Sequence, residues 1–149
     1  MSYQEKNVTV SLFTHLLIVG YYLVNLFQMY QTSGLVASRV FGLWAVVIIA
    51  TIIVTIIGSI LTNIVLAIVH AIRTQGEEEH FIEDERDQLI GLKGMKVSYI
   101  AFSIGVLLAM LTFVFGQPPL VMFSLLIFSS IAAQIIGDIS QIYLYRKGF

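Results

Sequence analysis

The stretch RTQGEEEHFIEDERDQLIGLKGMK, residues 73–96, is the only long polar segment in a chain otherwise dominated by apolar runs. It holds most of the charged residues of the sequence. Two apolar runs precede it and two follow it, so one polar connection joins two pairs of hydrophobic segments. Whatever the protein presents to soluble partners is therefore expected in this central segment.

Composition places the chain among membrane proteins. The 149 residues are 58% hydrophobic and 11% charged, whereas soluble domains carry roughly 25% charged residues. A soluble domain could bury a core, but it would not contain several apolar runs as long as the roughly 20 residues that cross a bilayer. The sequence contains no cysteine, which excludes disulfides, thiolate metal ligands and thiol redox chemistry.

Four membrane-spanning helices are predicted, and the fold class is therefore an all-α, integral membrane four-helix bundle in a single domain, residues 1–149. The expected spans cover residues 8–30, 40–72, 97–115 and 120–144. Pro118 and Pro119 are expected to end the third span and begin the fourth, because proline cannot continue a helix but suits its first turn. An acidic helix or loop is expected between the second and third spans.

The distribution of Lys and Arg predicts the orientation. Only Arg39 lies on one side of the expected bundle, and the other cations are predicted on the opposite side: Lys6, Arg73, Arg86, Lys93, Lys96, Arg146 and Lys147. Short loops rich in Lys and Arg stay in the cytoplasm. The sequence thus predicts a multi-pass protein of the cell membrane, with both termini and the central segment in the cytoplasm.

The acidic residues of the central segment have a purely structural interpretation. Residues 77–79 follow Gly76 and can begin a new helix, where the helix dipole favours negative charge. An imperfect apolar stripe then predicts an amphipathic helix over residues 77–96, lying on the membrane surface or running into the third span. Gly91 and Gly94 are expected to mark a bend or a close helix contact.

A metal site is the first functional alternative for this segment. Glu77 and His80 are three residues apart, as are His80 and Glu83, so each pair shares one face of a helix. Asp84 and Asp87 add carboxylate oxygens nearby. Acid-rich runs of this kind usually form only a solvated surface.

Docking of a basic partner is the second alternative, through the end of the acidic run: Asp84, Glu85, Arg86 and Asp87. This DERD motif is followed by Ile90 and Lys93, then by Ser98 and Tyr99 opening a span, and residues 145–148 close the next span. The pattern resembles a family of small, uncharacterised prokaryotic four-helix membrane proteins with a DERD signature. The resemblance covers chiefly residues 83–149, implies no activity, and implies a cytoplasmic regulatory protein as partner.

Polar residues inside the spans form a second candidate site, because they are costly in a bilayer and usually face the bundle interior. Counted at 1.5 Å per residue from the expected cytoplasmic boundaries, His15, Asn63, Ser103 and Asp138 all lie roughly 10 Å inside the membrane. They are expected to form one polar layer. A polar stripe also follows the fourth span: Ser130, Gln134, Asp138 and Gln141.

Three interpretations of these polar residues remain open. Interhelical hydrogen bonds, worth about 0.6 kcal/mol each on average, would explain them without further function. A proton or cation path is the functional alternative, and simple pairing of Asp138 with a cation of the central segment is the third. Asp138 is expected to face inward, with a partner from the second or third span and with His15 or Asn63 as neighbours.

Several chemistries have no support in the sequence. Haem ligation by His15 and His70 would need both side chains at one depth, but His70 is expected at the membrane edge. No serine lies in a nucleophile elbow, and no glycine-rich nucleotide-binding motif is present. No cofactor and no direct nucleic acid binding are therefore expected.

We therefore expect a bilayer protein that acts as a non-enzymatic binding or regulatory subunit through its acidic cytoplasmic segment, and that forms homo-oligomers. The alternative is a small proton- or cation-coupled transporter, or a channel-like oligomer, that uses the polar stripe of the fourth span. Asp138→Asn separates the two, because a helix-interaction protein should tolerate it and a proton-coupled one should not.

Overall fold

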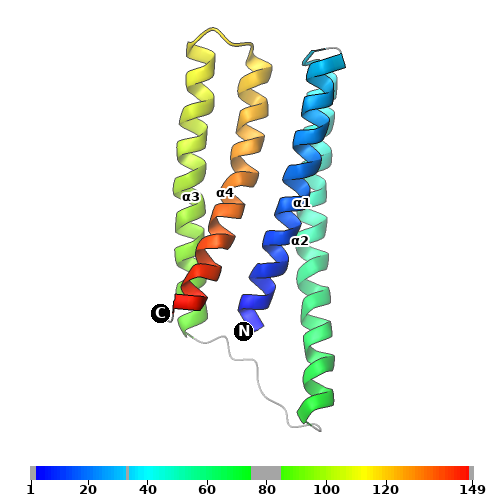
Figure 1. Ribbon diagram of the computed structural model, residues 1–149, viewed down its shortest axis with the longest axis vertical. Coiled ribbons are helices and arrows are strands. Elements are labelled where there is room, and N and C mark those ends of the chain that lie inside the picture. The colour runs from blue at the N-terminus through cyan, green and yellow to red at the C-terminus, as the bar shows by residue number, and fades with distance from the viewer. Residues whose placement is uncertain (1–2, 33, 75–84, 148–149) are drawn as a thin grey trace.

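Each of the four long apolar runs forms one helix. The computed structural model describes residues 3–32, 34–74 and 85–147, without several side chains in the later part of the second helix, Asn63 and His70 among them. The helices are α1, Tyr3–Thr32; α2, Ala37–Thr74; α3, Glu85–Val114; and α4, Pro119–Lys147 (Figure 1). All four are long and apolar enough to cross a membrane. The prediction of an all-α, multi-pass membrane four-helix bundle is thus confirmed.

The helices extend beyond the predicted spans. α2 has 38 residues, which corresponds to a length of about 57 Å, against a hydrocarbon core of about 30 Å. Its carboxyl-terminal part projects past the ends of α1 and α4 (Figure 1). α3 begins at Glu85, well before the expected start of the third span, and continues without interruption through Gly91 and Gly94.

Each of the two loops opposite the termini contains a glycine with a positive φ angle. Gly34 and Gly116 have φ angles of 72° and 78°, a region that glycine adopts without steric cost. After α3, the Gly116 N–H donates to the Phe113 carbonyl and the Gln117 N–H to the Thr112 carbonyl. This pair of bonds is a Schellman motif, which ends the helix. As expected, α4 then begins at a proline.

The closest helix pair is α3–α4, because small residues let the two backbones approach. Three glycines meet a side chain of the facing helix where a Cβ would otherwise lie: Gly94 meets Gln141, Gly105 meets Ser129, and Gly137 meets Ser98. Of the two expectations for Gly94, a bend or a close helix contact, the structure has the contact. Gly91 has open space where a Cβ would lie.

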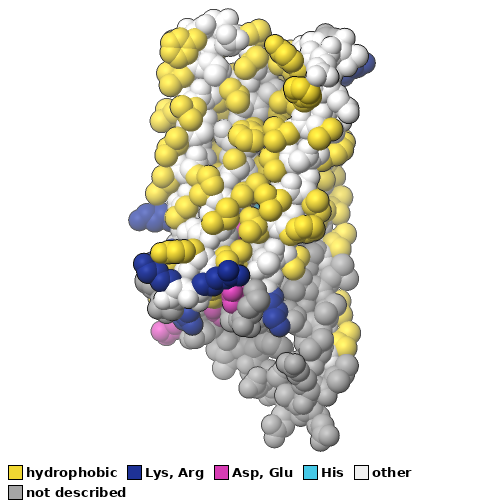
Figure 2. All heavy atoms as spheres, viewed as in Figure 1, with side chains coloured by type: hydrophobic (Ala, Val, Ile, Leu, Met, Phe, Trp, Pro, Cys, Tyr) yellow, Lys and Arg dark blue, Asp and Glu magenta, His cyan; other side chains and the backbone are white. Residues whose placement is uncertain are grey.

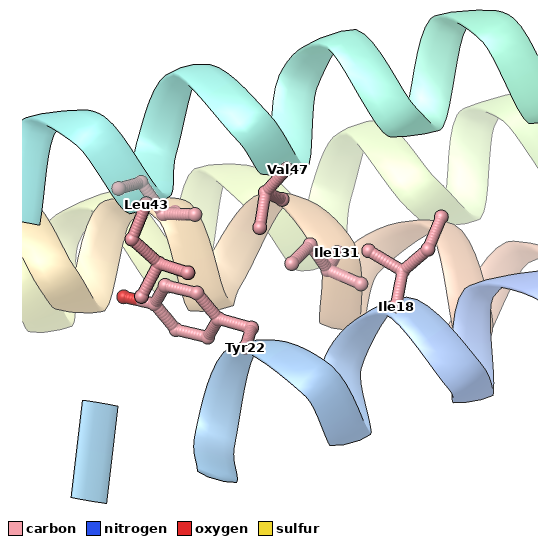
Figure 3. Packing of buried hydrophobic residues seen from close by; sticks show 6 residues of the cluster. Ile18, Tyr22, Leu43, Val47 and Ile131 are labelled. Atoms are coloured by element: carbon pink, nitrogen blue, oxygen red, sulfur yellow. The ribbon is translucent and has the colours of Figure 1, made fainter. Parts of the chain in front are cut away.

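The α1–α2 hairpin meets the α3–α4 hairpin mainly through α1. Among the described residues, α1 packs on both α4 and α2, whereas α2 touches α4 only slightly. Where these helices meet, their buried apolar side chains form a core, shown in Figure 3: Ile18 and Tyr22 of α1, Leu43 and Val47 of α2, and Ile127 and Ile131 of α4. The α1–α4 contact is therefore the principal connection between the two hairpins.

Charge is concentrated at one end of the bundle. The start of α1 and the end of α4 lie at the same end (Figure 1), and most of the visible Lys and Arg side chains gather there (Figure 2). Apolar side chains are spread over the rest of the described surface in this view (Figure 2). Arg39 lies near the start of α2, at the opposite end. The two termini therefore lie at the end of the bundle where Lys and Arg gather.

Candidate functional site

A buried polar cluster joins α1 to α4. It consists of Ser11 and His15, which are one turn apart on α1, and Asp138 of α4. The His15 Nδ1 atom lies 2.7 Å from Asp138 Oδ2, and Ser11 Oγ lies 3.2 Å from the same oxygen. His15 is 6% exposed and Asp138 is 8% exposed. The cluster is thus almost closed to the surroundings of the bundle.

The hydrogen-bond roles in the cluster follow from the chemistry of its groups. An ionised carboxylate only accepts, so His15 donates through Nδ1–H and Ser11 donates through its hydroxyl to one oxygen of Asp138. The 2.7 Å distance between Nδ1 and Oδ2 lies in the range of charge-assisted hydrogen bonds. Within the part of the chain that the structure describes, His15 Nε2 and Asp138 Oδ1 have no hydrogen-bond partner.

The cluster lies within the bundle, nearer the end that carries the termini. His15 is about 18 Å along α1 from its first residue, and Asp138 is about 13.5 Å along α4 from its last. Nearer that end, Arg146 Nε lies 3.5 Å from Glu5 Oε1, and the Glu5 side chain is only 10% exposed. Polar pairs therefore follow the first part of the α1–α4 contact.

Apolar packing follows deeper along the same contact. Ile18 of α1 and Ile131 of α4 belong to the core that begins there. Beyond them, the Tyr22 hydroxyl donates to the Ser124 carbonyl at 2.7 Å, and the Tyr22 side chain is almost fully buried. The polar cluster is thus separated from the opposite end of the bundle by a packed layer.

Of the four residues predicted to form one polar layer, the structure brings together two, His15 and Asp138. Ser103 of α3 donates to the Tyr99 carbonyl of its own helix. Gln134 is half-buried, one turn from Asp138, and no hydrogen bond joins it to the cluster among the described residues. The side chain of Asn63 lies outside the described ones.

A partner for Asp138 was expected from the second or third span, with His15 or Asn63 as neighbours. Its observed partners are Ser11 and the expected neighbour His15, and both lie on the first span. Depth along a helix gives the height of a residue, but not which neighbour it faces. Ser11 was missed, although its position one turn before His15 was the available signal.

The polar stripe of α4 does not face a single partner. Asp138 faces α1, whereas the Gln141 side chain lies over Gly94 of α3. The Ser130 hydroxyl donates to the Ile127 carbonyl of its own helix. These side chains therefore divide between two interfaces, and the stripe is not one continuous polar path along one neighbour.

Most of the acidic segment lies outside the described residues, including the metal candidates Glu77, His80, Glu83 and Asp84. Its described end is the first turn of α3, where Glu85 is exposed and Asp87 is half-buried. Arg86 Nη2 donates to the Tyr145 carbonyl of α4 at 3.5 Å. Among the described residues, no group of three His, Asp or Glu side chains could hold a metal ion.

These contacts define a site that joins two helices long and apolar enough to cross a membrane, and ionisable side chains within such helices usually serve function. The charged first turn of α3 and the last turn of α4 meet at the same end of the bundle. A scan against protein-family models and searches of curated proteins and of solved structures found no match.

Proposed function

We propose that the protein is a non-enzymatic binding or regulatory subunit of the cell membrane, with both termini in the cytoplasm. The observation that carries this proposal is the buried Ser11–His15–Asp138 cluster, which joins the two hairpins beside their charged end. The hydrogen bonds of this cluster connect one helix to another. A change in the α1–α4 contact would move the ends of both helices, where a soluble partner can bind.

The charged end has the features of a docking surface. Arg86 contacts the end of α4, and Arg146 pairs with Glu5 at the start of α1. Three helix ends are thus held together by contacts that a partner could strengthen or replace. The resemblance of residues 84–87 to the DERD signature supports a cytoplasmic regulatory protein as that partner.

A charge-reversal pair tests the docking surface. The wild-type protein, Arg86→Glu and the control Arg39→Glu at the opposite end are purified in mild detergent after cross-linking in cells. We expect one soluble protein in stoichiometric amount with the wild type and with Arg39→Glu, and its loss with Arg86→Glu. Equal recovery from all three proteins, or recovery of no soluble protein, would contradict the proposal.

Proton- or cation-coupled transport is the second candidate function. It is favoured by the one nitrogen of His15 and the one oxygen of Asp138 that have no hydrogen-bond partner among the described residues. Proteoliposomes loaded with a pH-sensitive dye test it. If the protein transports protons, the wild type shows a proton flux that both Asp138→Asn and His15→Gln abolish while the proteins stay folded. If it is a regulatory subunit, neither the wild type nor either variant shows a flux.

A further inference from the structure

An apolar groove lies between α1 and α4, in the half of the bundle away from the termini. Its volume is about 700 Å³, within the range of roughly 300–1,000 Å³ that is usual for ligand pockets. The groove is lined by apolar side chains of residues 23–30 of α1, by Leu35 of the following loop, and by Val121, Ser124, Leu125 and Phe128 of α4. The polar cluster lies at the other end of the same helix contact.

The groove presents hydrocarbon to its occupant. Ser124 is the one polar side chain of its α4 wall, and its hydroxyl already donates to the Leu120 carbonyl at 2.8 Å. The Ser124 carbonyl already accepts from the Tyr22 hydroxyl. A ligand with several polar groups would lose its hydrogen bonds to water on entering such a surface, so the occupant is apolar.

The groove has the depth of a single membrane leaflet. On α4 its lining ends at Phe128, about 13.5 Å from the first residue of the helix, which is close to half of the roughly 30 Å hydrocarbon core. Ile18 and Ile131, at 9% and 4% exposure, lie deeper in the packed core. The core thus closes the groove near the middle of the membrane.

This depth distinguishes a lipid chain from a helix. A transmembrane helix packs along the whole membrane thickness, and the groove would accommodate only about half of it. A lipid acyl chain starts at the headgroup level, beside Tyr30 and Leu35 at the loop end of the groove, and ends at the membrane centre. We propose that this groove binds an acyl chain of a phospholipid from the leaflet on the loop side of the bundle.

Native mass spectrometry of protein mixed with dipalmitoyl phosphatidylglycerol in mild detergent tests this proposal. Leu125→Trp fills the groove, and Val121→Trp does so nearer its loop end, as a second variant in case the first fails to fold. Leu108→Trp is the matched control, because Leu108 is 60% exposed on α3 and lies, like Leu125, about 9 Å from the loop end of its helix. Circular dichroism establishes which variants are folded.

We expect one lipid per chain on the wild type and on the control. We expect at least about a tenfold weaker binding to the folded groove variants, about 1.4 kcal/mol, because the added indole ring occupies volume that the acyl chain would fill. Equal lipid binding to all folded proteins would overturn the proposal. A lipid-free wild type would also overturn it, as would a dimer that Leu125→Trp dissociates, because a second copy would then occupy the groove.

Discussion

Asp138→Leu removes the acceptor that holds α1 against α4, and its effect can be worked out from the cluster. The mutation leaves His15 Nδ1–H and the Ser11 hydroxyl without their shared oxygen. An average hydrogen bond between membrane helices contributes about 0.6 kcal/mol, whereas removing one partner of a buried ion pair costs about 3–5 kcal/mol. The side chains of His15 and Asp138 are only 7% and 12% exposed, and Nδ1 lies 2.7 Å from Oδ2. We therefore expect Asp138→Leu to lower the free energy of unfolding by about 2–4 kcal/mol.

The matched substitution is Asp138→Asn, which keeps the shape and one acceptor oxygen. His15 and Ser11 can still donate to that oxygen, so we expect the free energy of unfolding to fall by about 1 kcal/mol or less. Unfolding in mixed micelles by increasing dodecyl sulfate measures each free energy. Ser130→Ala serves as the control, since the Ser130 hydroxyl bonds only within its own helix among the described residues, and it should change stability by less than about 0.5 kcal/mol.

A double-mutant cycle isolates the contact itself. If His15 and Asp138 stabilise each other, His15→Leu combined with Asp138→Leu should be less destabilising than the sum of the single changes, by at least about 1 kcal/mol. Additive losses, or equal effects of Asp138→Leu and Asp138→Asn, would refute the reasoning, because they would show that the short contact contributes no more than ordinary packing.

Three further outcomes follow from the helix contacts and charges. Tyr22→Phe keeps the buried ring but loses its bond to a carbonyl of α4, and denaturant unfolding should show a loss of about 1 kcal/mol. Gly137→Val would overlap Ser98 across the α3–α4 contact and should cost about 2 kcal/mol or more in the same assay, whereas Gly20→Ala, with open space around it, should not. Reporter fusions at the carboxyl terminus should read cytoplasmic and those at Gln117 external, and an external carboxyl terminus would contradict the proposed orientation.

The helices could be predicted because apolar runs of this length have few alternatives in a membrane, but their ends could not. Helical hydrogen bonding continues past the hydrocarbon boundary wherever the sequence permits it. α3 therefore starts at Glu85, although the apolar run begins only at Val97. Gly94 shows a related limit, because a glycine that permits a bend equally permits a close contact, and only the facing Gln141 decides between them.

The level of the candidate site along the helices could be predicted, but not which neighbouring helix each side chain faces. Counting residues placed His15 and Asp138 at one level, and this level is where the two side chains meet. The rotation of each helix depends on its neighbours, which the periodicity of a single segment does not specify. For this reason the stripe of α4 was expected to act as one surface, whereas Asp138 and Gln141 serve different interfaces.

The order of contacts along α1 and α4 connects the two proposals physically. From the charged end, the interface carries Glu5–Arg146, the His15–Asp138 cluster, the apolar core, Tyr22–Ser124 and finally the groove. Among the described residues α3 packs on α4 and α2 mainly on α1, so little else fixes the spacing of the two hairpins. A partner at the charged end and an acyl chain in the groove would therefore act on the same contact. If each binds one spacing better than another, each must change the affinity of the other by the same factor.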